Sequence, residues 1–233
     1  MHLTKNLLPK SKWEAFTLQV SLSLSLFVLI ALWLYFALYP SFYFSMAGGI
    51  QGLLLILGVH IVLGPILTLL VFNTNKKKRE ILSDLGFIIL IQLAALIYGL
   101  HIVYKERPQL VLIFKQGTAT ILNAREVAEN PKLTTTLQQT NNSIESVAVS
   151  LSLADNGQAI FTDPLTNPAV LTQLTQESRR FITQPNELEE LKTLESQHTS
   201  IYIISMMGKY TGAYIILDPQ LKYLGKIGEK PSS

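Results

Sequence analysis

Long uncharged runs of apolar residues fill the first half of the chain and predict membrane-spanning helices. No Asp, Glu, Lys or Arg occurs from Ala15 to Asn75, and none occurs from Leu85 to Tyr104. About 20 apolar residues cross the ~30 Å hydrocarbon core as a helix, so the first run is long enough for two spans. Pro40 and the paired glycines 48 and 49 divide it. We therefore expect a membrane region at 15–104 with spans at about 16–39, 50–72 and 85–103.

The residues after 104 have the pattern of a water-soluble domain. Apolar and β-branched residues at 110–114 and 118–122 flank a turn at 115–117, which predicts a hairpin. Residues 147–153 alternate like a third strand, and residues 130–145 are typical of a loop. Further strands are expected at 201–205, 213–217 and 221–227.

Two helices are expected between these strands. Asn167 followed by Pro168 predicts one start, with Val170, Leu171, Leu174 and Phe181 on the buried face. Asn186 with Glu189 predicts a second start closed by a capping box, with Leu188, Leu191 and Leu194 inside. The sequence thus predicts a three-helix membrane anchor followed by an α+β domain, residues 105–233, with a mainly antiparallel sheet.

The charges predict how this anchor is oriented. Lys76, Lys77, Lys78 and Arg79 follow the second apolar run at once, and further lysines lie in residues 1–14. Because Lys and Arg near spans stay on the cytoplasmic side, residues 1–14 and 73–84 are expected inside. Asp84 would then open the third helix, and residues 39–48, rich in Tyr and Phe, would form an aromatic belt at the outer surface. In a bacterium this places the protein in the inner membrane with residues 105–233 in the periplasm.

Small and polar residues inside the spans are candidate functional positions. The spacings Ser21-x-x-x-Ser25 and Gly48-x-x-x-Gly52 allow close helix packing, either within the chain or with the helix of a partner. Gly64 and Pro65 predict a kink in the second span. His60 lies near mid-span, where a polar group is either functional or hydrogen-bonded between spans; for Gln51 and Gln92 we expect the hydrogen bond.

No pattern in the chain predicts catalysis, a cofactor or a metal site. The sequence contains no cysteine, no phosphate-binding glycine loop, no Gly-x-Ser-x-Gly and no His-Glu-x-x-His. His198 is the only histidine after residue 104 and has no partner at a recognisable spacing. The excess of positive charge lies in the first 84 residues, which indicates membrane topology rather than nucleic-acid binding. We expect a non-enzymatic protein.

Three segments resemble a known family. They are Ser11-Lys12-Trp13-Glu14-Ala15-Phe16, the stretch Gly64-Pro65-Ile66-Leu67-Thr68-Leu69-Leu70-Val71-Phe72-Asn73 with the lysines after it, and 93–100 leading into Glu106-Arg107-Pro108. Together they resemble the type IV pilin accessory proteins of the TfpX/TfpZ type, most specifically over residues 11–128. In the related sequences we expect an acidic residue near the position that His60 occupies in this chain.

The resemblance also implies a partner and a role. The partner is a type IV major pilin, contacted through its membrane helix and its periplasmic head, and the role is to help that pilin accumulate and assemble. Given such a partner, we expect the small-residue faces around Ser21, Ser25, Gly48 and Gly52 to contact the pilin helix within the lipid bilayer, because small side chains allow close packing there. Homo-oligomerisation stays open, as do two other classes: a membrane-anchored sensor, and an accessory subunit of another envelope machine for secretion or glycan transfer.

Overall fold

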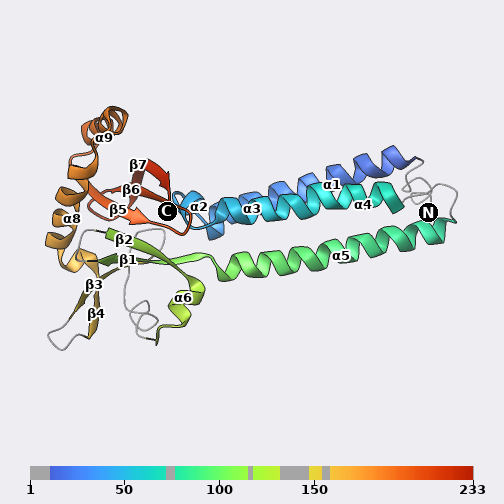
Figure 1. The fold of residues 1–233 in the computed structure, drawn as a ribbon, viewed down its shortest axis with the longest axis horizontal. Coiled ribbons are helices and arrows are strands. Elements are labelled where there is room, and N and C mark those ends of the chain that lie inside the picture. The colour runs from blue at the N-terminus through green and yellow to red at the C-terminus, as the bar shows by residue number, and fades with distance from the viewer. Residues whose placement is uncertain (1–10, 72–76, 115–117, 132–146, 154–157, 233) are drawn as a thin grey trace, which may run out of the picture. The chain divides into compact units, whose positions relative to one another are not determined.

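A computed structural model describes residues 11–71, 77–114, 118–131, 147–153 and 158–232 (Figure 1). The contacts divide the chain into two compact units. The first consists of residues 1–36 and 50–104, and the second of residues 37–49 and 105–233. The segment between the first two apolar helices therefore belongs to the same unit as the predicted soluble domain.

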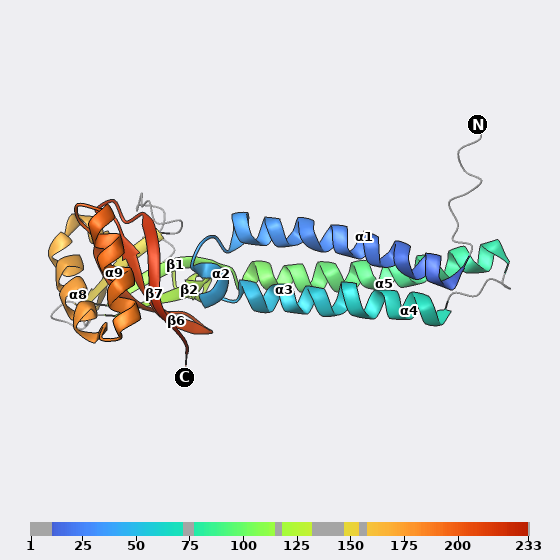
Figure 2. The same ribbon diagram turned by 90° about the horizontal axis from the view of Figure 1, so that it is seen from above.

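The first unit contains three long helices that lie alongside one another (Figure 2). The first is α1 (Lys12–Trp33), which continues through a π-helical turn, η1 (Leu34–Leu38). The second consists of α3 (Gly49–Leu57), a π-helical segment η2 (Gly58–Leu63) and α4 (Gly64–Val71), and the third is α5 (Lys78–Lys105). All three are long and apolar enough to cross a membrane, over Lys12–Leu38, Gly49–Val71 and Arg79–Lys105.

The third helix begins earlier than the apolar run does. We predicted that Asp84 opens it, but α5 already starts at Lys78, so that prediction was wrong. Lys, Arg and Glu are good helix formers and extend the helix beyond its uncharged part. The uncharged length indicates the thickness of the hydrocarbon core that a helix can cross, and the helix itself is longer. The first helix, α1, starts where Ser11 Oγ accepts a hydrogen bond from Glu14 N at 3.1 Å.

A seven-stranded sheet forms the second unit, with the order β4-β3-β1-β2-β5-β6-β7. The predicted hairpin is confirmed, because β1 and β2 pair antiparallel. The sheet is mixed, however: β1 pairs parallel with β3 and β2 pairs parallel with β5, while the other neighbours are antiparallel. The strands are β1 (Pro108–Phe114), β2 (Thr118–Asn123), β3 (Val147–Leu153), β4 (Ala159–Thr162), β5 (Tyr202–Met207), β6 (Thr211–Leu217) and β7 (Tyr223–Pro231).

The parallel pairs correct the prediction of a mainly antiparallel sheet. Strand pattern reveals which residues are extended but not which strands become neighbours. Here the β1–β2 hairpin lies at the centre, and the later strands join it on both sides. Leu110, Val111, Leu112 and Ile113 are buried on both faces of β1, as a central strand requires.

Helices α8 (Pro168–Phe181) and α9 (Pro185–Gln197) pack against β5, β6 and β7 (Figure 1). Backbone amides of β5 donate to α8: Ile203 N to Thr175 Oγ1 at 3.0 Å, and Ser205 N to Ser178 Oγ at 3.1 Å. Two short elements complete this part, η3 (Pro164–Thr166) and α6 (Ala124–Ala128). The apolar core between α9 and the sheet consists of Ile182, Leu191, Ile203, Ile216 and Ile227.

Several details of these helices were predicted wrongly. Helix α9 begins at Pro185 after Gln184, so the capping box predicted at Asn186 and Glu189 does not form. Proline has the fixed φ of a first helical residue and moves the start back. Phe181 is 71% exposed rather than buried, because α8 ends there. The predicted loop at 130–145 lies almost wholly outside the described residues.

Candidate functional site

The helices of the first unit bury inward stripes with a spacing of about four residues. On α5 the buried residues are Ile88, Gln92, Leu96, Gly99 and Val103. On the second helix the buried stripe is Gly52, Ile56, His60, Gly64 and Thr68, and Gly49 and Pro65 are buried beside it. A four-residue spacing keeps side chains on one helix face, so each stripe is the surface with which its helix packs on its neighbours.

Gln92 connects all three helices at one depth. Its Oε1 accepts a hydrogen bond from Gln19 Nε2 on α1 at 2.9 Å, which confirms the expected bond between spans. Its amide also lies against Gly64 of α4, where a Cβ atom would be only 1.8 Å from Gln92 Nε2. A side chain at position 64 would therefore force the Gln92 amide to shift. Gln19 was not predicted, although it is the one amide side chain of α1.

The π-helical segment η2 ends directly before Gly64 and Pro65. Proline has no N–H and cannot donate to the carbonyl four residues before it, and a wider turn relieves that conflict. Thr68 Oγ1 supports the same region by donating to Gly64 O at 3.1 Å. Next to Gly64 and Pro65, where a kink was predicted, the second span contains a π-helical segment.

His60 lies within this segment and is 4% exposed. Among the described residues, no hydrogen-bond partner is found for His60 Nε2, Gln92 Nε2 or Gln51 Oε1. Unpaired polar groups are costly in lipid, where water cannot replace a missing partner. The interior of the first unit therefore has unused hydrogen-bonding capacity near His60 and Gln92.

The predicted small-residue positions lie in different surroundings. Ser21 and Ser25 are exposed on α1, and Ser25 Oγ donates to Ser21 O within the helix at 2.9 Å. Gly52 packs inward, where a Cβ would be 3.0 Å from Val103. Gly48 is not on a helix: its φ is +110°, and Tyr210 lies against it. Of these four, Ser21 and Ser25 have an open surface in the described structure.

The basic cluster is described in part. Lys77 and Arg79 are exposed, whereas Lys76 and the side chain of Lys78 lie outside what is described.

In the residues that the structure covers, no three His, Cys, Asp or Glu side chains are grouped closely enough to hold a metal ion.

Residues 37–49, which we name the outer loop, pack into the second unit. Tyr39, Phe42, Tyr43 and Met46 are each at most 1% exposed. Our prediction of an aromatic belt was therefore wrong for these aromatic side chains, which protein atoms cover instead. Tyr and Phe suit a lipid interface and a protein core equally well, so composition alone did not separate the two. Burial, together with the negative charge of Glu106, raises the pKa of Tyr39, which stays neutral.

Specific contacts hold the outer loop on strands β5 to β7. Tyr210 N donates to Met46 O at 3.1 Å, and Lys226 Nζ donates to Ser45 Oγ at 2.9 Å. Gly208 lies so close to Met46 that a Cβ there would be 2.4 Å from Met46 O. Helix α2 (Tyr43–Met46) is the helical part of this loop, and it packs on β6.

Lys226 is shared between the outer loop and an acid. Its Nζ also lies 2.5 Å from Glu229 Oε2. Burial alone would raise the pKa of Glu229, but hydrogen bonds from Lys226, Ser45 and Thr211 outweigh burial and lower that pKa. The ionised carboxylate of Glu229 thus helps to hold the loop.

Comparisons with known proteins place the chain among assembly factors. No family model matches it, and no solved structure matches it. It is 34% identical over 106 residues to a fimbrial assembly protein of serogroups C1 and C2 from Dichelobacter nodosus, covering 46% of this chain and 80% of that protein. Those of serogroups I and E1 are 33% and 34% identical, and the match covers 41% and 36% of their lengths. The chain therefore belongs to the family of fimbrial assembly proteins.

Proposed function

We propose that this protein is an inner-membrane accessory factor of type IV pilus biogenesis. It binds a type IV major pilin before assembly and stabilises it, and it carries out no chemistry on that pilin. The observation that carries the proposal is the similarity to proteins named for fimbrial assembly. Three helices able to cross a membrane and a separate mixed-sheet unit support it.

In the proposed arrangement the second unit lies in the periplasm. The distribution of Lys and Arg supports this arrangement. The basic residues 76–79 follow the second apolar run, and such residues stay on the cytoplasmic side. The outer loop then lies on the same side as residues 105–233, which agrees with its contacts to Tyr210 and Lys226.

Ser21 and Ser25 are the proposed contact for the pilin's membrane helix. Both are exposed on α1. Small side chains let two helices approach closely, and van der Waals packing drives helix association where lipid offers no hydrophobic gain. The second unit would contact the pilin head and select which pilin is accepted, because a polar folded surface distinguishes partners better than an apolar helix does.

Gene deletion and surface substitution test the proposal together. Deletion should lower pilin abundance and surface piliation, while the remaining pilin keeps its mass. Replacing Ser21 and Ser25 by Leu should lower pilin recovery in a pull-down of the full-length protein. Ala94→Leu is the matched control, since Ala94 is also a small exposed residue of a membrane helix.

Three results would contradict the proposal. They are an unchanged pilin level after deletion, a pilin of altered mass, and a pull-down that recovers another envelope machine instead of pilin. Exchange of the second unit with that of a relative serving another pilin should move the preference. That exchange must include residues 37–49 as well as 105–233, because both segments build the unit.

A further inference from the structure

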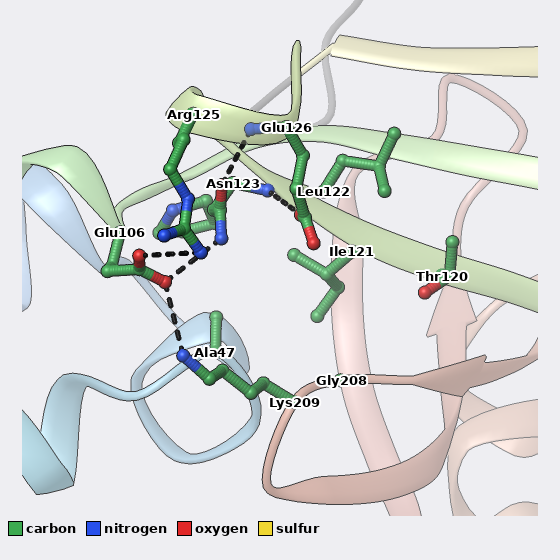
Figure 3. Close-up of a pocket in the computed structure, with 11 residues that line it drawn as sticks. Ala47, Glu106, Thr120, Ile121, Leu122, Asn123, Arg125, Glu126, Gly208 and Lys209 are labelled. Carbon is green, nitrogen blue, oxygen red and sulfur yellow. Dashed lines mark hydrogen bonds and ion pairs between the residues drawn. The ribbon is translucent and has the colours of Figure 1, made fainter. Parts of the chain in front are cut away.

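A cavity of about 250 Å³ lies in the second unit (Figure 3). Glu106 lines it and directly follows Lys105, the last residue of α5. Ala47 also lines it and lies two residues before α3 begins at Gly49. Consecutive Cα atoms are ~3.8 Å apart, so chain connectivity alone keeps this cavity within several ångströms of where both spans end.

A triad of charged side chains forms one wall of the cavity. Glu106 Oε1 lies 3.1 Å from Arg125 Nη2, and Glu106 Oε2 lies 3.1 Å from Lys209 Nζ. Asn123 Nδ2 donates to the same carboxylate at 3.0 Å. One carboxylate therefore holds two cations, and the triad has a net charge of +1.

Both cations keep donors for a further anion. The side chains of Arg125 and Lys209 are 58% and 54% exposed, whereas that of Glu106 is 22% exposed. A guanidinium has five N–H donors and an ammonium has three, and Glu106 occupies only part of each set. Figure 3 shows the two cationic groups converging on Glu106 from different elements, α6 and the β5–β6 turn.

A second carboxylate faces the cavity from the other side of Asn123. Glu126 Oε2 accepts from Asn123 N at 2.8 Å, and Asn123 Oδ1 accepts from Glu126 N at 2.9 Å, so a capping box fixes this side chain. Within the described part of the chain, no Lys or Arg forms an ion pair with Glu126. Its negative charge is thus available to a cationic group.

We propose that this cavity binds the headgroup of a phospholipid that has both a phosphodiester and a primary ammonium. The phosphate accepts from the donors of Arg125 and Lys209 that Glu106 leaves unoccupied, as charge-assisted hydrogen bonds favour. The ammonium donates to Glu126, and the apolar side chains of Pro108, Ile121 and Leu122 contact the glycerol end. Two cations and two carboxylates match a ligand with one charge of each sign. Glu106 and Ala47 are one and two residues along the chain from candidate spans, which favours a lipid headgroup over a soluble ligand.

Native mass spectrometry of the full-length protein in detergent tests this, with phosphatidylethanolamine, phosphatidylglycerol and phosphatidylcholine as probes. Phosphatidylethanolamine should be retained best. Arg125→Gln and Lys209→Gln should each weaken its retention about tenfold, the effect of losing one charge-assisted hydrogen bond. Glu126→Gln should remove the preference for phosphatidylethanolamine over phosphatidylglycerol. Lys192→Gln and Glu190→Gln, exposed on α9, are the matched controls and should retain lipid normally.

The results that would overturn the proposal are distinct. Equal retention of all three lipids by the native protein would remove the headgroup site, and so would cavity variants that match the controls. If free phosphoethanolamine or inorganic phosphate displaces the lipid at equal concentration, the cavity serves a soluble phosphate. Thermal melting of each variant checks that the second unit stays folded. The outcome does not depend on pilin binding, so the two proposals fail separately.

Discussion

Gly64→Ala probes the packing inside the first unit most directly. A Cβ at this position would lie 1.8 Å from Gln92 Nε2, far inside van der Waals contact. The Gln92 amide must therefore shift, and we expect it to lose its 2.9 Å bond to Gln19 when it does. A single methyl group on α4 should break a hydrogen bond between α1 and α5.

The cost follows from these contacts. Hydrogen bonds between membrane helices contribute on average ~0.6 kcal/mol and at most ~1.7 kcal/mol. The crowding itself is relieved when the end of the flexible Gln92 side chain rotates away, so the lost hydrogen bond is the main cost. We expect Gly64→Ala to lower the free energy of unfolding by about 1 kcal/mol. Gly86→Ala should not lower it, because nothing lies within 4 Å of a Cβ at Gly86 and Ala forms helices better than Gly.

A double-mutant cycle with Gln92→Ala separates crowding from other effects. In that background the amide is absent, so Gly64→Ala should cost less than about 0.5 kcal/mol. The measurement is the unfolding of the purified full-length protein in mixed micelles, followed by circular dichroism during SDS titration. An equal cost of Gly64→Ala in both backgrounds would refute the reasoning, as would a cost no larger than that of Gly86→Ala.

Three other predictions concern orientation, the outer loop and pH. A periplasm-dependent reporter should be active when fused after residue 233 and inactive after residue 78; the opposite pattern would invert the topology. Gly208→Ala should lower the melting temperature of the second unit, because its Cβ would be 2.4 Å from Met46 O, whereas Gly212→Ala, with its nearest atom at 3.4 Å, should be tolerated. Glu229→Gln should destabilise the protein at neutral pH. Folding lowers the pKa of Glu229 below its ordinary 4.5, so the stabilisation exists above that value and disappears as pH falls through the folded pKa. The melting temperatures of native protein and variant should therefore converge in acid, and a gap that persists there would contradict this role.

The three apolar helices and most strands could be predicted because their signals are local. The length of an uncharged apolar run indicates a helix that can cross a bilayer. Alternation of apolar and polar residues indicates a strand with one buried and one exposed face. The β1–β2 hairpin was predicted correctly because its two strands follow each other closely in the chain. The bond made by Gln92 was expected from the high cost of an unpaired amide in lipid.

Features that depend on distant partners could not be predicted in this way. Gln92 needed Gln19, which lies 73 residues earlier in the chain. The parallel pairing of β2 with β5 depends on where the chain re-enters the sheet after α8 and α9, and the alternation of apolar and polar residues does not predict this. The cavity beside Glu106 combines side chains from α6 and the β5–β6 turn. These elements lie far apart in the chain, so no local sequence pattern predicted that they would meet.

The placement of the outer loop has a consequence for the order in which the protein is made. The bond from Lys226 to Ser45 joins residues 181 positions apart. At ~5–20 residues per second, a ribosome needs roughly 10–40 s to make that intervening chain. Throughout this time Tyr39, Phe42 and Tyr43 have no strands β5 to β7 to cover them. A lipid interface is the natural place for such side chains meanwhile, so the aromatic residues of the loop suit the newly inserted chain as well as the folded one.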